Sequence, residues 1–540
     1  MAELDLLNKF NRAYILSLVD IDIFKAVQMY REYIAYLKEN NELNEELKLM
    51  KSSFLKKLEN FVFNQMNKEK ISELIPAYQE LLSEFPNSVL LKINCSEIFS
   101  RLEQYDISID LLKEASKTAP YNVQVKKLLF GTYNCVQDFK NAILVGKEIV
   151  ELEGNALNYS ELALCYNYLY DNEDNEENLK NAILNMEIAY KLNNNEKIIL
   201  KNLIILYTKA KDDNKLKFYW NEFMKKFPMN GEDRFNYSAF LIRHGDFKKG
   251  FEFYESRFKH EKKPTEYPKI EKPLYSGKQN LSKSTLLIQS EQGLGDVFLF
   301  SRFIKQLKAK KIIFRVPDCV YEITKRSLKD IEVVPYSVSL LDLKFDYHLP
   351  LMSLPYVLGI TTDDVIQKEK YFVSDENKVE EFKNKFFNND KFKIGISFKG
   401  NEVGLKSRNI DLSYLLPLAK IDSVQVYSLQ YREPEKNFKD TNIINLGNYL
   451  NDYDDTAAMI ENLDLLVTID NSTMNLAGAL GKKSYCLFNY LPEFRWFDLD
   501  GENVKWYESI KPYQCKQQGD WSPVIEKIVS DIKEIIKWKF

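Results

Sequence analysis

The feature that most constrains the fold is a turn signal that returns at a fixed interval in the first half of the chain. Pro86 is followed by Pro120 and then by Gly154, two equal steps of 34 residues. Further turn signals lie at residues 193–195 and 228–230, after one longer step. The segments between the turns carry apolar residues at helical spacing, so the period predicts stacked pairs of antiparallel helices.

A period of 34 residues is that of the tetratricopeptide repeat (TPR), whose unit is a pair of antiparallel helices. We expect a helical cap over residues 1–60 and a TPR array over residues 61–258, with the acidic stretch 171–178 as an exposed loop. About four or five units would stack into a curved solenoid, because one unit cannot bury its apolar face alone. The groove of such a solenoid is predicted to bind an extended peptide, and a scaffold that only supports the next domain is the alternative.

Composition and charge narrow the function classes. Of the 540 residues, 45% are hydrophobic and 29% are charged, which is globular composition. Basic residues number 75 and acidic residues 79, without a polybasic run, so we do not expect a nucleic-acid partner. The acidic N-terminus and the lack of 18 consecutive apolar residues predict a cytoplasmic protein with no membrane span. Six scattered cysteines without a C-x-x-C pair and only three histidines predict neither a metal centre nor a Ser-His-Asp triad.

The sequence changes character after residue 282, where short apolar runs alternate with glycines and helical segments, as in parallel βαβ units. A strand at 286–290 is followed by a glycine loop with Gly293 and Gly295 and then by Asp296. Phe298 stands at the third glycine position of the dinucleotide fingerprint, so that match is weak. Asp296 is then either a plain helix cap or a carboxylate presented to a ligand at the start of a helix.

A second α/β segment favours the ligand-facing alternative. The predicted strand 393–398 runs into a loop rich in glycine and basic residues, which includes Lys406 and Arg408 but lacks Walker spacing. The buried strand 463–469 ends in four polar residues that begin the next helix: Asp470, Asn471, Ser472 and Thr473. Amides and hydroxyls at a helix start attract anions, so this loop set is predicted to hold a phosphate or diphosphate.

Residues 240–525 carry many short stretches, in order, that resemble bacterial TPR-containing glycosyltransferases. These are relatives of the ADP-heptose:lipopolysaccharide heptosyltransferases of glycosyltransferase family nine, and they include TPR-bearing flagellin glycosyltransferases. The matching stretches are 274–277, 291–303, 394–396, 400–401, Arg408, 428–430, 455–458, 463–465, Asp470, 476–481, 494–496, 506–507, 519–521 and the junction 245–255.

The resemblance implies an α/β GT-B glycosyltransferase with two Rossmann-like halves behind the all-α TPR superhelix. The implied boundaries are a linker at 259–282, an N-terminal half at 283–385 and a C-terminal half with a C-terminal helix at 386–540. The implied reaction is inverting and needs no metal and no cofactor besides the nucleotide-sugar donor. Asp498 and Asp500 spell a D-x-D motif, but they lie in a late loop, so we interpret the match as coincidence.

Residue roles follow from the same resemblance. Asp296 is expected to be the catalytic base, and Asp470 to bind donor hydroxyls. Gln430 is expected near the nucleoside, and Asn475 stands where the family usually has a histidine. The donor diphosphate is expected to bind Lys406, Arg408, Asn471, Ser472 and Thr473.

Three functions remain open from the sequence. The first is O-glycosylation of Ser or Thr in a protein bound by the TPR groove, with flagellin as the expected acceptor. The second is a heptosyltransferase for the lipopolysaccharide core, for which the TPR half would be superfluous. The third is a non-catalytic TPR binding protein with a degenerate transferase fold.

Overall fold

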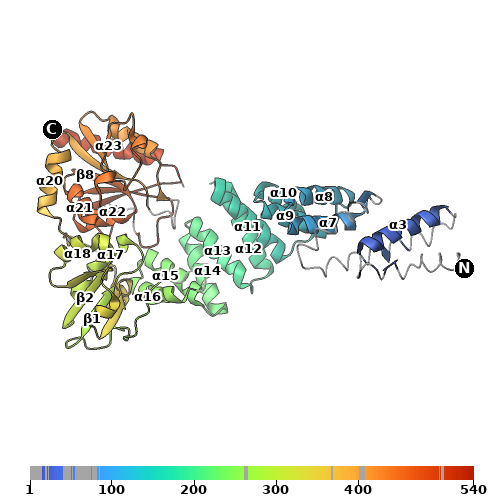
Figure 1. The fold of residues 1–540 in the computed structure, drawn as a ribbon, viewed down its shortest axis with the longest axis horizontal. Coiled ribbons are helices and arrows are strands. Elements are labelled where there is room, and N and C mark those ends of the chain that lie inside the picture. Colours follow the sequence, from blue (N-terminus) through green and yellow to red (C-terminus); the bar gives the residue numbers. More distant parts are fainter. Residues whose placement is uncertain are drawn as a thin grey trace. The chain divides into compact units, whose positions relative to one another are not determined.

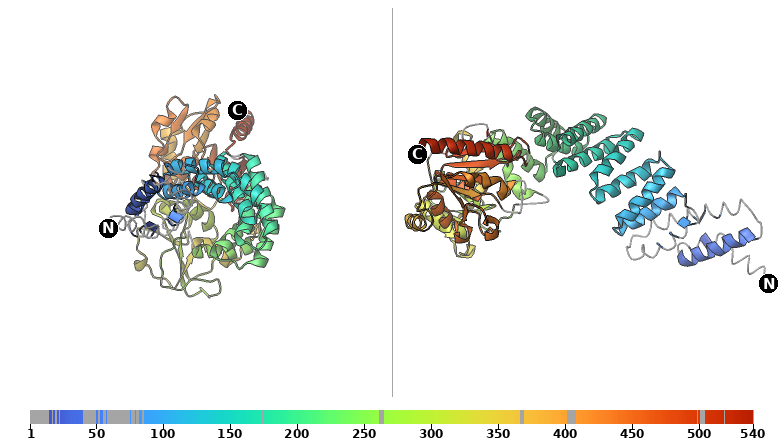
Figure 2. Two further views of the ribbon diagram at one scale, coloured as in Figure 1. Left: turned by 90° about the vertical axis from the view of Figure 1, so that its right-hand side faces the viewer. Right: turned by 90° about the horizontal axis from the view of Figure 1, so that it is seen from above.

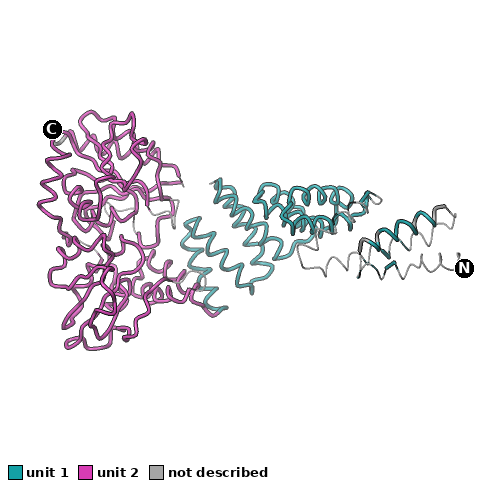
Figure 3. The backbone as a smooth tube through the Cα atoms, in the orientation of Figure 1, with its two compact units in different colours: residues 1–227 teal, residues 228–540 magenta. Residues whose placement is uncertain are grey.

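The computed structural model describes residues 86–540 except 174, 261–264, 366–368, 401–407, 498, 500–503, 518 and 540. Before residue 86 it describes helix α3 (Ile23–Glu39) and a few single residues, so most of the predicted cap at 1–60 lies outside the described part. The chain divides into two compact units, residues 1–227 and 228–540 (Figure 3).

The first unit is a series of helix pairs. Figure 2 shows its helices following one another along an arc. The helices after α3 are α7 (Val89–Arg101), α8 (Tyr105–Thr118), α9 (Val123–Cys135), α10 (Phe139–Leu152), α11 (Ala156–Glu173), α12 (Glu176–Leu192), α13 (Lys197–Lys209) and α14 (Asp213–Lys226).

The 34-residue period is visible in the backbone of these pairs. Glu103 and Gln137 lie 34 positions apart, each between the two helices of a pair, and both have a positive φ, 62° and 59°. Two ion pairs repeat at the same spacing, Lys92 with Glu114 and Lys126 with Glu148. The first unit therefore resembles TPR repeats, as predicted.

The inserted acidic stretch is more helical than we predicted. Helix α11 runs to Glu173 and α12 starts at Glu176, where Asn175 caps it by accepting a hydrogen bond from the Glu177 N–H at 3.0 Å. The predicted loop over 171–178 is thus largely absorbed by the two helices. An acidic first turn suits a helix N-terminus, because negative charge there interacts favourably with the helix dipole.

The second unit contains two parallel sheets with their helices (Figure 1). The strands of the first sheet are β1 (Thr285–Gln289), β2 (Lys311–Val316), β3 (Glu332–Pro335) and β4 (Tyr347–Pro350), in the order β3-β2-β1-β4. The strands of the second sheet are β5 (Phe392–Ser397), β6 (Val424–Ser428), β7 (Ile443–Asn445), β8 (Leu465–Ile469), β9 (Ser484–Phe488) and β10 (Ile510–Gln514).

The second sheet has the order β10-β9-β8-β5-β6-β7, and all of its strand pairs are parallel. Counted from its own first strand, that order is 3-2-1-4-5-6 reversed, the order of a Rossmann fold. The chain direction across the sheet reverses between β5 and β8, and the corresponding neighbours in the first sheet are β1 and β4. Ligands of open α/β sheets bind at such switch points, beyond the carboxyl ends of the strands.

Helices cover both faces of the second sheet. One face packs on α23 (Ser522–Lys539) and on the 3₁₀ helix Leu412–Lys420. The other face joins the core formed with α20 (Glu376–Phe386), α21 (Tyr453–Glu461) and α22 (Ser472–Ala479). The first sheet contributes to that same core through one face, with α17 (Leu294–Ser301), α18 (Tyr321–Ser327) and α19 (Leu354–Leu358).

Two boundaries differ from the prediction. Helices α15 (Gly231–Arg243) and α16 (Phe247–Tyr254), which we assigned to the array, belong to the second unit, because Ile242, Phe247 and Phe251 are buried in the α/β core. The predicted linker also packs on the first sheet. The Tyr275 N–H donates to the His348 carbonyl at 2.8 Å, and Leu281 is buried in the core.

A core glycine offers a test of this packing. A Cβ on Gly478 in α22 would lie 2.5 Å from ring carbons of Tyr507, so Gly478→Ala should destabilise the second unit by about 1 to 3 kcal/mol. Gly131 in α9 is the control, because a Cβ there meets nothing within 4 Å and alanine is the better helix former. Urea unfolding followed by circular dichroism should show a loss for Gly478→Ala and none for Gly131→Ala. Equal effects would contradict the packing.

Candidate active site

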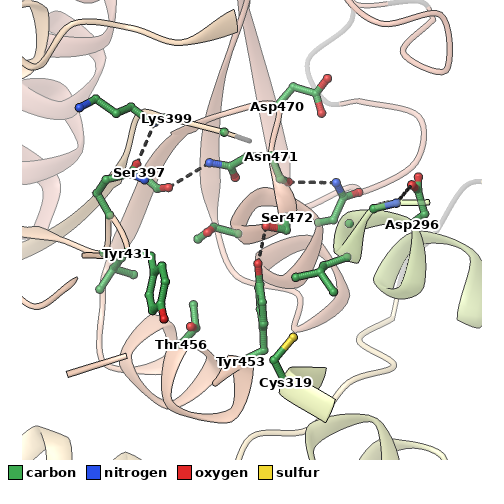
Figure 4. A pocket seen from close by; sticks show the side chains of 18 of the residues that line it. Asp296, Cys319, Ser397, Lys399, Tyr431, Tyr453, Thr456, Asp470, Asn471 and Ser472 are labelled. Carbon is green, nitrogen blue, oxygen red and sulfur yellow. Dashed lines mark hydrogen bonds between the residues drawn. The ribbon is translucent and has the colours of Figure 1, made fainter. Parts of the chain in front are cut away.

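A cavity of about 620 Å³ lies at the carboxyl ends of β1, β5, β6 and β8, within the second unit (Figure 4). Its size is that of a typical small-ligand site. The first sheet contributes the glycine loop and Asp296, and the second contributes the loops after β5, β6 and β8. Of the residues predicted for the site, the cavity is lined by Gly293, Gly295, Asp296, Arg408, Gln430, Asp470, Asn471, Ser472, Thr473 and Asn475. Lys406 lies outside the described residues.

Asp296 is both a helix cap and a residue of the cavity. It occupies the third position of α17, and its Oδ2 accepts a hydrogen bond from the Gly293 N–H at 2.9 Å. Its Oδ1 accepts from Arg495 Nη1, and the two side chains form an ion pair. Burial raises the pKa of Asp296, while Arg495 and the Gly293 N–H oppose that rise. The Asp296 side chain therefore caps α17 and also lines the cavity.

Arg495 is the site residue that sequence reasoning left without a role. It lies in the segment between β9 and β10 and also pairs with Glu493, whose Oε2 is 2.9 Å from Arg495 Nε. The backbone carbonyl of Arg495 accepts a hydrogen bond from Trp506 Nε1 at 2.8 Å. A signal existed in residues 494–496, which match the resembling family, but nothing in the sequence placed that arginine beside Asp296, which is 199 positions away.

Asp470 is the second carboxylate of the cavity, and its ion pair with an arginine is longer than that of Asp296. The N-cap of α22 is Asn471, whose Oδ1 accepts from the Met474 N–H at 3.0 Å, so Asp470 does not cap this helix. Arg408 Nη1 lies 3.6 Å from Asp470 Oδ2 and donates to the Asp470 backbone carbonyl at 3.1 Å. Burial raises the pKa of Asp470 to about 6, Glu493 adds to the rise, and Arg408 and Arg495 oppose it.

The side chains of Asn471 and Asn475 make hydrogen bonds within the protein. Asn471 Nδ2 donates to Ser397 Oγ at 2.9 Å, so this side chain joins α22 to the end of β5. Asn475 Nδ2 donates to the Asn471 carbonyl at 3.0 Å, and Asn475 Oδ1 accepts from the Tyr507 hydroxyl at 3.1 Å. Both asparagines line the cavity, and these bonds hold the start of α22 in place.

Gly295 allows α17 and α22 to meet. A Cβ at this position would lie 2.9 Å from Asn475 Nδ2 and 3.5 Å from the Ser472 Cα, so only glycine fits between the two helix starts without displacement. Both N-termini are therefore held at the cavity. Ser472 Oγ lies 2.5 Å from the Tyr453 hydroxyl. Figure 4 shows that pair beside Cys319, which follows β2 of the first sheet.

Gln430 fixes the loop after β6. Its Oε1 accepts from the backbone N–H groups of Phe398 and Lys399 at 3.0 and 2.8 Å, which ties this loop to the one after β5. The next residue, Tyr431, is 53% exposed and lines the cavity, where Figure 4 places it near Thr456. Lys399 also lines the cavity but pairs with Glu433 at 2.7 Å.

Comparison with known proteins gives limited similarity. No family model matches the chain. Protein FlbA of Caulobacter vibrioides is 23% identical over 335 residues, and the match covers 56% of this chain and 55% of FlbA, so the chain spans about half the length of that curated relative.

Solved structures match the helical part. YrrB, a TPR protein with an unusual peptide-binding site, is 13% identical with a TM-score of 0.29 and covers 33% of this chain and 90% of its own. MamA from Desulfovibrio magneticus RS-1 is 16% identical with a TM-score of 0.28, covering 32% and 94%. PilF of Pseudomonas aeruginosa is 12% identical with a TM-score of 0.30, covering 38% and 89%. The TPR-like assignment rests on the repeat geometry and not on these superpositions.

Neither a membrane-spanning helix nor a metal-binding cluster occurs in the described part of the chain. None of its helices is both long and apolar enough to cross a bilayer. No group of three or more His, Cys, Asp or Glu side chains within it is placed to hold a metal ion.

The raised pKa of Asp470 predicts a pH effect on stability. Between about pH 4 and 6 the folded protein keeps a proton on Asp470 that the unfolded chain releases, so the free energy of unfolding should fall as the pH rises through that window. The full effect is up to about 3 kcal/mol. Asp470→Asn should remove this pH dependence and stabilise the protein at pH 7, measured by urea unfolding from pH 4 to 7.5. A variant with the same pH dependence as the wild type would refute the assignment.

Proposed function

We propose that this protein is a glycosyltransferase that moves a sugar from a nucleotide-sugar donor to Ser or Thr of a protein bound by the TPR-like array. One observation carries the proposal: a single cavity faces Asp296 of one sheet toward Asp470, Arg408 and the start of α22 of the other. In this proposal the second unit is a GT-B transferase, with the donor in the cavity between its two halves. The protein acceptor is proposed to be flagellin, on the resemblance of residues 240–525 to flagellin glycosyltransferases.

The proposed chemistry is a direct displacement at the anomeric carbon. The acceptor oxygen forms a bond to that carbon, the bond to the donor phosphate breaks, and the acceptor proton passes to Asp296. A buried carboxylate with a raised pKa suits this role, because a general base works best when its pKa approaches the working pH. Arg495 would keep the carboxylate oriented and offset its charge in the dry cavity.

The leaving nucleotide phosphate needs positive charge. Arg408 and the N-terminus of α22 are the described groups that supply it, and Lys406 is proposed as a further partner. Asp470 would accept a hydrogen bond from a donor hydroxyl. Because Asp470 also faces Arg408, it holds that guanidinium at the cavity before the donor arrives.

A non-catalytic binding protein is the second candidate, and one observation favours it. Both oxygens of Asp296 are engaged, one by the Gly293 N–H and one by Arg495, as in a purely structural carboxylate. Asn475 at the position of the family histidine agrees with that reading. The two candidates differ in whether the removal of Asp296 abolishes turnover.

Variants of the cavity decide between them. Asp296→Asn should lower turnover by about 10²- to 10⁴-fold, because an amide cannot act as the base. Donor affinity should stay nearly unchanged, because the amide oxygen can still accept a hydrogen bond from the Gly293 N–H and Arg495 keeps its ion pair with Glu493. Arg408→Ala should instead weaken donor binding by about 10- to 100-fold, the value of one charge-assisted hydrogen bond. Transfer is measured by mass spectrometry of the acceptor and affinity by calorimetry. Asp318→Asn, an exposed carboxylate of the same half, is the control. Near-normal turnover in Asp296→Asn would contradict the assignment of Asp296 as the base.

Metal dependence offers an independent test. A diphosphate held by a helix start and arginine side chains needs no divalent ion, so transfer should survive excess EDTA. The assay compares initial rates with and without EDTA, and then after addition of Mg²⁺ or Mn²⁺. Activity that disappears with EDTA and returns with metal would place the enzyme in the metal-dependent class.

The role of the array is tested by separating the two units. Residues 228–540 have their own core, so this unit expressed alone should still hydrolyse the nucleotide sugar. It should modify the protein acceptor far more slowly than the whole chain, because the acceptor is no longer concentrated near the cavity. Residues 1–227 should bind the acceptor without modifying it. Equal rates for the whole chain and the separated unit would make the array a scaffold.

A further inference from the structure

The α15–α16 helix pair contacts the two segments that carry the Asp296–Arg495 ion pair. The chain leaves α16 at Tyr254 and continues as the 3₁₀ helix Glu255–Lys259. Tyr254 and Arg257 are 2% and 1% exposed, and neither lines the cavity. Their side chains touch the loop that carries Asp296 and, through Tyr254, the segment that carries Arg495.

The first tie is a buried ion pair. Arg257 Nη2 donates to Glu291 Oε1 at 2.7 Å, and Arg257 Nε donates to Glu291 Oε2 at 3.2 Å. Glu291 Oε1 also accepts from the Met352 N–H at 3.1 Å, and Arg257 Nη2 donates to Ser353 Oγ at 2.8 Å. Two parallel hydrogen bonds fix both position and orientation, so the end of β1 is clamped to the helix pair and to the loop after β4.

The second tie lies one residue further along the same loop. The Tyr254 hydroxyl lies 2.9 Å from Gln292 Nε2, which donates to it, and 3.2 Å from Gln292 Oε1. Gln292 has a φ of 60°, a left-handed conformation that costs free energy in a non-glycine residue and persists only where the surroundings impose it. The next N–H, that of Gly293, is the one that donates to Asp296. The residue with the strained backbone, Gln292, therefore directly precedes the residue whose N–H bonds to Asp296.

The third set of contacts is with the segment between β9 and β10, which carries Arg495. Phe494, the neighbour of Arg495, packs on the Tyr254 ring with centroids 5.9 Å apart, and on Phe235 of α15 at 6.4 Å. Arg243 of α15 donates to the Pro492 carbonyl at 3.0 Å. The segment that brings Arg495 to Asp296 thus rests on the same helix pair as the glycine loop does.

We propose that Tyr254 and Arg257 are positioning residues that hold the glycine loop, and with it the Asp296 carboxylate, in register with Arg495. Neither residue would touch donor or acceptor. The effect on turnover rests on the proposed function, whereas the effect on the loop does not. A consequence is that the helix pair nearest the array in the sequence sets the geometry of the cavity.

Hydrogen–deuterium exchange, read by mass spectrometry on peptides covering residues 290–298, tests the loop directly. Tyr254→Phe removes one hydroxyl and keeps the ring, so exchange of the loop amides should rise roughly three- to tenfold, the worth of one neutral hydrogen bond. Tyr427→Phe is the matched control, because Tyr427 is equally buried and its hydroxyl is bonded to Asn389 and to the Phe386 carbonyl, away from this loop. It should leave these peptides unchanged. Equal exchange in Tyr254→Phe and wild type would overturn the proposal.

The ion pair is tested without leaving a buried charge alone. The double variant Arg257→Met/Glu291→Met removes both fully buried charges, whereas Arg257→Met alone would leave Glu291 buried without its cation. Glu255 also pairs with Arg257, but it is only half-buried and keeps its hydrogen bond from Ser353 Oγ in the double variant. Exchange over residues 290–298 should rise in the double variant as well. Arg257→Lys keeps the charge but loses the parallel bonds, so its exchange should fall between the wild type and the double variant. Wild-type exchange in the double variant would overturn the role of Arg257.

Kinetics then separates positioning from simple stability. Tyr254→Phe should lower kcat several-fold with the donor Kd unchanged, whereas Tyr427→Phe should change neither. Faster loop exchange with an unchanged kcat would overturn the positioning role, because the register would not matter to the reaction. If wild-type protein transfers no sugar from any nucleotide donor, the proposed function fails, and the exchange measurements still decide whether these residues hold the loop.

Discussion

The contact between the starts of α17 and α22 is the constraint on which the site depends. The two helices come from different sheets, and they meet because Gly295 has no side chain where Asn475 and Ser472 approach. That contact puts the carboxyl ends of β1 and β8 at one cavity. The glycine loop and the described parts of the loops after β5, β6 and β8 bring polar residues to this same cavity. A Cβ at Gly295 would displace the Asn475 amide, which bonds to the Asn471 carbonyl at the start of α22.

Charge in this unit is buried in pairs rather than dispersed. Asp296 lies with Arg495, and Glu291 lies with Arg257, whose side chain is fully buried. Burying an ion pair gains little stability, since desolvation offsets most of the attraction, whereas stranding one partner is costly. A rearrangement of the loops that separated either pair would therefore cost free energy.

The polar residues at the start of α22 make different contacts: the two asparagines bond within the protein, and Asp470 faces Arg408. Asn471 caps the helix and bonds to Ser397, and Asn475 bonds to Tyr507 and to the helix itself. Asp470 is left facing Arg408, with a pKa raised by burial to about 6.

The sequence by itself determined the helix pairs and the two parallel sheets, because a 34-residue period and the alternation of short apolar runs with glycine turns are local patterns. It also located Asp296 and residues 470–473, since loops after parallel strands gather at one edge of a sheet. Only the tertiary structure decided that α15 and α16 pack in the α/β core, that Arg495 meets Asp296, and that Tyr254 contacts both loops. Those contacts join residues 38 to 259 positions apart in the chain. No periodicity or spacing encodes them, because they arise from how separately folded segments bury their surfaces against one another.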